Sequence, residues 1–178
     1  IDSNMFFCNW PKSFTYFFFL MLIVLSCRQE KKSQGEEKSK WSKGHSVNFN
    51  QELLIREQMQ IKLFLDHQQS LKMNLTNSGL RYMIYKNGVG KELAKNGQLA
   101  TIKIKISLLD GTICYETIDN EYEYFGIEKS EKEFGIHELV KYMKVGDKAK
   151  AILPSHLAHG LLGDRENIPP QSILYLDV

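Results

Sequence analysis

The stretch LVKYMKVGDKAKAILPSHLAHGLLGDRENIPPQSILYLDV, residues 139–178, decides the fold of this chain. Apolar residues at helical spacing up to Met143 predict a short amphipathic helix over residues 135–143, and a Val145-Gly146-Asp147 turn follows it. After the turn, lysines alternate with apolar residues, which predicts a strand. A last strand is predicted over residues 173–178, so we expect the sequence to stop within a strand.

Residues upstream of this stretch predict further strands in antiparallel order. Apolar residues alternate with other side chains over 80–85, and three isoleucines alternate with lysines over 102–106. Both patterns are typical of half-buried strands. Asp110-Gly111 predicts a hairpin turn into a strand over 112–115. Strands joined by tight turns around one short helix indicate an α+β fold, in which a twisted antiparallel sheet wraps the helix at 135–143.

Three short motifs follow one another in the last forty residues. The M-K-V-G turn at 143–146, the L-A-H-G loop at 157–160 and the I-P-P step at 168–170 resemble those of FKBP-type peptidyl-prolyl cis-trans isomerases. Several motifs in the right order are more specific than any one of them alone. The resemblance implies an FKBP-like isomerase domain over residues 78–178, in which the motifs frame a proline-binding pocket.

The resemblance also implies which side chains line this pocket. The floor at the start of the helix is Ile136, and the wall before the proline pair is Ile168. The aromatic residue of the last strand is Tyr175. A further aromatic wall before the helix is Tyr122 or Tyr124.

Four other pocket positions depart from the family pattern. Ile104 replaces a tyrosine, Cys114 a phenylalanine, Tyr115 an aspartate and His159 the tyrosine of the loop. In the family the first tyrosine and the aspartate hydrogen-bond to each other, so losing both leaves no buried polar group unpaired. The departures predict low activity or altered specificity. They resemble a Bacteroidetes-like branch of membrane lipoproteins that includes the gliding-motility isomerase.

Rotation about an X-Pro bond requires no nucleophile, metal or cofactor. Its barrier of about 18–20 kcal/mol comes from amide resonance, and a dry apolar pocket favours the less polar twisted amide. We therefore expect no acid/base pair, and His159 and Tyr115 are the catalytic candidates. His159 either donates a hydrogen bond to the substrate carbonyl before proline or caps its own loop. The rival functions are a non-catalytic peptide-binding chaperone and a structural envelope lipoprotein.

The first 27 residues resemble the signal peptide of a bacterial lipoprotein. Lys12 precedes an apolar run at 14–25, which is too short to span a bilayer of about 30 Å. Val24-Leu25-Ser26-Cys27 resembles a lipobox, which implies lipidation of Cys27 and anchoring to the bacterial cell envelope, facing the periplasm or in the outer membrane. The alternatives are an uncleaved anchor or an ordinary signal peptide with an incidental cysteine.

A polar segment and a helix are predicted between the leader and the isomerase domain. Residues 28–47 contain too few aliphatic side chains to fold and predict a tether. Residues 48–70 predict a helix that begins with a capping box from Asn48 to Gln51. Its apolar stripe either packs on the domain or pairs with a second copy in a homodimer, and it comprises Leu54, Ile55, Met59, Ile61, Phe64 and Leu65.

Composition and single motifs limit the partners of this chain. The net charge of +2, with 25% charged residues, argues against nucleic acid as a partner. Cys114 is the one cysteine within the predicted domain, so no disulfide forms there. His156 and His159 have metal-like spacing, but no further ligands complete a site. We expect no metal and no cofactor, and proline-containing polypeptides as the partners.

Overall fold

The computed structural model describes residues 43–118 and 120–178 of the chain. In this part the elements are α2 (Lys43–His67), β1 (Asn74–Leu75), β2 (Arg81–Lys86), β3 (Leu99–Ile102), β4 (Lys105–Leu108), β5 (Ile113–Glu116), β6 (Glu123–Gly126), α3 (Phe134–Lys141), β7 (Lys148–Leu153), the 3₁₀ turn η1 (Ser155–Leu157) and β8 (Leu174–Asp177). The predicted signal peptide, its Cys27 and the tether up to residue 42 lie outside the described residues.

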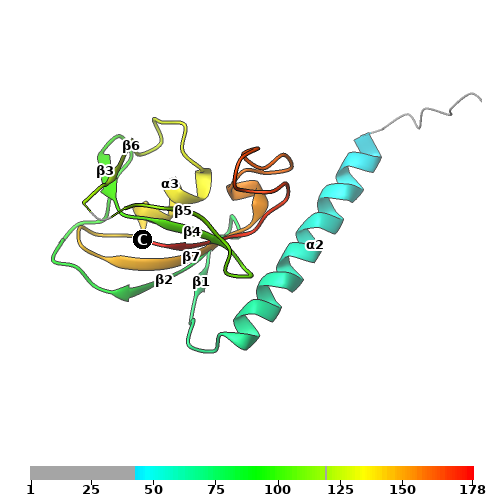
Figure 1. Cartoon of the computed structure of the whole chain (residues 1–178), viewed down its shortest axis with the longest axis horizontal. Helices are drawn as coiled ribbons and strands as arrows, with labels where there is room; N and C mark the ends of the chain where they lie inside the picture. The colour runs from blue at the N-terminus through cyan, green and yellow to red at the C-terminus, as the bar shows by residue number, and fades with distance from the viewer. Residues whose placement is uncertain (1–42, 119) are drawn as a thin grey trace, which may run out of the picture. The chain divides into compact units, whose positions relative to one another are not determined.

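The strands of the described chain form two antiparallel sheets. Six of them pair in the order β1-β2-β7-β8-β4-β5, and β3 pairs with β6 separately. Figure 1 shows α3 against one face of the larger sheet. Apolar side chains of α3 form the inner cluster with the inward-facing residues of β4, β7 and β8. The predicted α+β fold, with an antiparallel sheet around one short helix, is confirmed.

The hairpin predicted at Asp110-Gly111 is present. The Leu108 amide donates to the carbonyl of Thr112 at 2.9 Å, and the Thr112 amide donates to Oδ1 of Asp110 at 2.9 Å. Gly111 has φ of +93°, a conformation that glycine adopts without steric cost. This turn sets the register of β4 against β5 and so places Tyr115 opposite Ile106.

The single strand predicted over 102–106 is wrong, because the chain changes partners within it. β3 pairs with β6, whereas β4 pairs with β5 and β8. Ile104 lies at the break, where Thr117 replaces a ladder partner. The Ile104 amide donates to Oγ1 of Thr117 at 2.9 Å, and the Thr117 amide donates to the Ile104 carbonyl at 2.9 Å. These bonds satisfy the backbone while the Ile104 side chain turns into the core.

Helix α2 differs from its predicted start and face. It includes Lys43 and residues up to 47 that were assigned to the tether, so Asn48 lies inside the helix and does not cap it. Its predicted stripe is buried only in part: Ile61, Phe64 and Leu65 pack on the domain, whereas Leu54, Ile55 and Met59 are exposed. The face that packs on the domain is set by contact with the outer side of the sheet.

The contact of α2 with the domain forms a second, outer cluster. Ile61 packs there with Ile152 of β7 and Ile173, and Phe64 contacts Tyr175 with ring centroids 5.6 Å apart. Packing on the domain, the first of the two alternatives, is observed for Ile61, Phe64 and Leu65, and pairing with a second copy stays a prediction. Among the described residues, no helix has the length and apolar character needed to cross a membrane.

Candidate active site

Three isoleucines from distant parts of the chain belong to the inner cluster. Ile104 precedes β4, Ile136 lies in the first turn of α3, and Ile168 precedes the Pro169-Pro170 step. Their exposed fractions are 3%, 0% and 2%. The structure thus brings the floor and wall residues named from the sequence into one apolar cluster between helix and sheet.

Gly135 allows α3 to begin directly on the sheet. A Cβ at this position would lie 2.4 Å from Cδ2 of Leu153 and 3.1 Å from the carbonyl oxygen of Leu157. Any larger residue would push the start of the helix away from β7. The absence of a side chain at Gly135 therefore sets the depth at which Ile136 enters the core.

A polar pair lies beside this apolar cluster. The hydroxyl of Tyr115 donates to a carboxylate oxygen of Asp164, and the Asp164 carboxylate also accepts the amides of Glu166 at 2.9 Å and Ile168 at 2.8 Å. Partial burial opposes ionisation, but these hydrogen bonds and the charge of His159 lower the pKa of Asp164 to about 2. The bond to Asp164 and partial burial raise the pKa of Tyr115.

The lowered pKa of Asp164 predicts an acid-dependent loss of stability. Its pKa falls from 3.8 to about 2 on folding, so its contribution is complete above pH 3.8 and is lost as the pH falls through about 2. We expect the urea midpoint of the wild type to decrease more steeply across this range than that of Asp164→Asn. Urea titrations at a series of pH values measure the difference, and equal slopes would show that the folded carboxyl has an ordinary pKa.

His159 is held by a carboxylate from the other side of the site. Its Nε2 lies 2.9 Å from Oε1 of Glu133, the residue directly before α3. Because a carboxylate only accepts, Nε2 carries the hydrogen in this pair. The two side chains are 27% and 11% exposed. The imidazole therefore bonds to a residue outside its own loop, so the alternative in which it caps that loop is not what the structure shows.

The remaining predicted pocket residues differ in how deeply they are buried. Cys114 and Tyr115 are half-buried and pack against the inner cluster, and partial burial raises the pKa of the Cys114 thiol. Tyr122 and Tyr124 are both exposed, at 49% and 65%. The buried aromatic residue of β6 is Phe125, at 6% exposure. Thus neither tyrosine is the buried aromatic residue of this strand.

The placement of Tyr175 in the pocket is wrong. It lies in the outer cluster, where its ring contacts Phe64 of α2, on the face of the sheet opposite to Ile136. Successive side chains of a strand point to opposite faces, so its neighbour Leu176 belongs to the inner cluster instead and is 0% exposed. An error of one residue in register moved the predicted side chain to the wrong face.

The sequence reasoning missed Asp164, Glu133, Phe125 and Leu176. Asp164 had one local signal, because Asp followed by polar residues before a proline step is typical of a turn in which the carboxylate accepts nearby amides. Nothing near Glu133 indicates that it bonds to a histidine 26 residues away. Such pairs become visible only in three dimensions.

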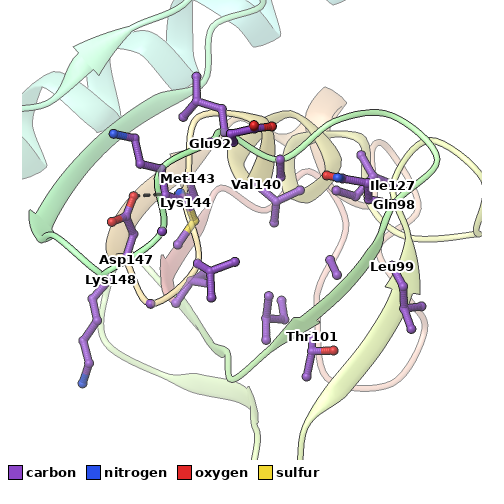
Figure 2. Close-up of a pocket in the computed structure, with 18 of the residues that line it drawn as sticks. Glu92, Gln98, Leu99, Thr101, Ile127, Val140, Met143, Lys144, Asp147 and Lys148 are labelled. Carbon is purple, nitrogen blue, oxygen red and sulfur yellow. Dashed lines mark hydrogen bonds between the residues drawn. The ribbon is translucent and has the colours of Figure 1, made fainter.

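A further cavity, drawn in Figure 2, is lined mostly by other residues. Its volume is about 1030 Å³, and it is lined by Val140 of α3, by Met143 just after the helix, by β3 and by the 144–148 turn. Tyr122 is its one residue among the predicted pocket residues. A smaller cleft of about 550 Å³ adjoins the site itself and includes Glu133 and His159. We place the candidate site at the isoleucine cluster with the Tyr115–Asp164 pair, and the smaller cleft borders it on the side of Glu133 and His159.

Within residues 43–118 and 120–178, no three His, Cys, Asp or Glu side chains come together as metal ligands. The groups beside the isoleucine floor are hydrogen-bonded to one another, as Tyr115 is to Asp164 and His159 is to Glu133. What the arrangement offers chemically is an apolar surface with hydrogen-bond donors at its edge.

Fold and site together define a class of α+β domain in which an apolar site lies between one helix and the sheet that wraps it. A family model described as FKBP-type peptidyl-prolyl cis-trans isomerase matches residues 90–178. The chain belongs to this family. The crystal structure of AtFKBP13 has a similar fold, with a TM-score of 0.55 and 24% identity over 60% of this chain and 94% of that one.

Named relatives agree with the family assignment. The FKBP-type peptidyl-prolyl cis-trans isomerase FkpA of Buchnera aphidicola subsp. Schizaphis graminum is 34% identical over 67% of this chain and 47% of that protein. Peptidyl-prolyl cis-trans isomerase Fkbp12 of Drosophila melanogaster is 35% identical over 56% of this chain and 94% of that protein. The chain covers 57% of a second Buchnera FkpA, so it spans about half the length of these bacterial relatives.

Proposed function

We propose that this protein catalyses cis-trans rotation of X-Pro peptide bonds. The observation that carries the proposal is the cluster of Ile104, Ile136 and Ile168 beside the donors Tyr115 and His159. The names of its relatives support the same activity. An apolar floor removes water from the prolyl amide, and this favours the twisted state in which the amide has lost resonance.

The donors at the edge would fix the backbone on either side of the proline. In the proposed mechanism His159 donates to the carbonyl oxygen of the residue before proline. Its Nε2–H now bonds to Glu133, so donation requires the substrate oxygen to take the place of that carboxylate, or a second proton on Nδ1. Glu133 holds the ring in orientation until the substrate arrives, and binding that is stronger for the twisted amide lowers the barrier.

A protease-coupled cis-trans assay on the purified protein tests this proposal. We expect the wild type to accelerate isomerisation of a proline peptide and His159→Ala to lower kcat/KM by about tenfold or more, as for loss of one transition-state hydrogen bond. His156→Ala is the matched control. That ring lies in the same turn but bonds to the Ser78 carbonyl at 2.9 Å, so its loss should leave the rate unchanged. A wild-type rate in His159→Ala would remove the assigned role.

A second candidate function rests on how closed the site is. The three floor isoleucines are at most 3% exposed, and the bond from Tyr115 to Asp164 lies beside them. A non-catalytic peptide-binding chaperone of the same fold would have no need to admit a prolyl ring. The two candidates separate in one experiment, because the chaperone suppresses aggregation of an unfolded client without accelerating the proline peptide.

We further propose that the substrates are exported proteins and that Cys27 carries a lipid anchor on the bacterial cell envelope. The support is the sequence alone, an apolar run at 14–25 followed at once by Ser26-Cys27 and a charged segment. Expression of the full chain in bacteria supplied with a labelled fatty acid tests it. Label should enter the wild type and be absent from Cys27→Ser, and equal labelling of both would end the proposal.

A further inference from the structure

The face by which α2 contacts the domain contains a carboxylate. Leu53, Glu57 and Ile61 follow one another at intervals of four residues and are 8%, 1% and 0% exposed. Most of the remaining helix is exposed. A buried carboxylate is costly unless a hydrogen-bond partner compensates for lost water. Apolar packing of the helix therefore does not explain why the Glu57 carboxylate is buried.

Glu57 contacts the turn that follows β7. Its Oε2 accepts the backbone amide of Ser155 at 3.2 Å, and this bond is buried. Its Oε1 is also buried, and among the described residues it has no hydrogen-bond partner. Among the described residues, the bond to the Ser155 amide is therefore the hydrogen bond that compensates the buried Glu57 side chain for lost water.

Ser155 is the residue on which this turn closes. Its carbonyl accepts the amides of Ala158 at 3.0 Å and Gly160 at 2.8 Å. His159 lies between these two donors, and its ring reaches Glu133 at 2.9 Å. The amide side of Ser155 is thus fixed by α2, and its carbonyl side fixes the backbone on both sides of His159.

We propose that Glu57 is a positioning residue for His159, so that helix α2 is a working part of the site. The proposal rests on the proposed isomerase function, in which His159 binds the substrate. Without the carboxylate, the Ser155 amide loses its acceptor and the turn from 155 to 160 loses its tie to α2. His159 then samples orientations away from Glu133, and an incorrectly placed donor is a weak catalyst.

The test compares three variants of the purified protein. Glu57→Leu keeps the volume and removes the acceptor, and Glu57→Asp keeps the charge but shortens its reach. Gln58→Ala is the matched control. It removes the bond from α2 to Arg81 Nη2, 2.5 Å long, and leaves Ser155 untouched. Amide hydrogen exchange of Ser155 and Gly160, the NMR resonances of the His159 ring and kcat/KM are measured for each.

We expect Glu57→Leu to speed exchange of the Ser155 amide by about tenfold or more, because that amide is exposed by local opening. We expect its His159 resonances to shift and kcat/KM to fall by about five- to tenfold, mainly through kcat. Glu57→Asp should change in the same direction by less, and it carries the test if Glu57→Leu fails to fold. Gln58→Ala should match the wild type in all three.

Two results would overturn the proposal. Fast Ser155 exchange with unchanged His159 resonances and unchanged kcat/KM would show that Glu57 only docks the helix. Equal changes in Gln58→Ala would show that general loosening of α2 is the cause. If the wild type shows no isomerase activity, the proposed function fails, yet the His159 resonances still decide whether Glu57 positions that ring.

Discussion

Gly163→Ala is expected to abolish measurable isomerase activity and to lower the free energy of unfolding by about 3 kcal/mol or more. Gly163 has φ of +65°, and a Cβ there would lie 2.1 Å from the carbonyl oxygen of Ile168 and 2.7 Å from the carbonyl carbon of Pro169. Backbone atoms cannot rotate away as a flexible side chain can. The segment would have to open, and Asp164 and Ile168 would leave the site together.

Gly160→Ala is the control for this substitution. Gly160 has nearly the same φ, +62°, but a Cβ there meets nothing within 4 Å. In both variants the alanine must adopt the left-handed conformation, which costs about 1–2 kcal/mol. Only in Gly163→Ala does the new Cβ also collide with backbone atoms. Urea denaturation and the proline-peptide assay on both variants measure the difference. If the two variants lose equal stability, the closure of the loop over residues 163–169 is looser than the structure shows.

Ile136→Ala is expected to give the second large effect. Truncating a fully buried isoleucine costs about 2–5 kcal/mol, through lost burial and the cavity left behind. We expect kcat/KM of the folded protein to fall by about tenfold or more as well, because the apolar floor then admits water to the amide. The measurements are urea denaturation and the proline-peptide assay under conditions where the variant remains folded.

Ile61→Ala separates stability from activity in this comparison. Ile61 is also 0% exposed but lies in the outer cluster, on the other side of the sheet. The same truncation there should reduce stability by a similar amount and lower kcat/KM by much less than Ile136→Ala does, because Ile61 affects the site only through the docking of α2. If both variants lost activity equally, Ile136 would be ordinary core and the site would have to be placed elsewhere.

Gly163→Ala and Ile136→Ala change two different parts of the site. The sequence predicted the second part and not the first. Ile136 and Ile168 were named from the family resemblance, which rests on motifs formed by residues close together in the chain. No local motif indicates that Gly163 matters for the site. Its role depends on the backbone of Pro169, six residues later, which folds back against it. No pattern in the sequence predicts that contact.

The aromatic positions show the limit of pattern reasoning. Tyr122, Tyr124 and Tyr175 were expected to line the pocket, but the buried residues are their neighbours Phe125 and Leu176. A strand presents alternate residues to opposite faces, so the correct strand with a shift of one residue gives the wrong side chain. Helix α2 shows the same limit, since half of its predicted stripe is exposed and Leu53 and Glu57 are buried although neither was predicted to be.

The amino-acid sequence by itself determined the α+β class, the short helix, the Asp110-Gly111 hairpin and the three motifs of the family. These features depend on residues close together in the chain, whose spacing and backbone preferences act locally. The tertiary structure alone decided that Tyr115 donates to Asp164, that Glu133 holds His159 and that Glu57 holds Ser155. Those bonds join residues 26 to 98 positions apart, and such pairs form only once the packed core has fixed which segments meet.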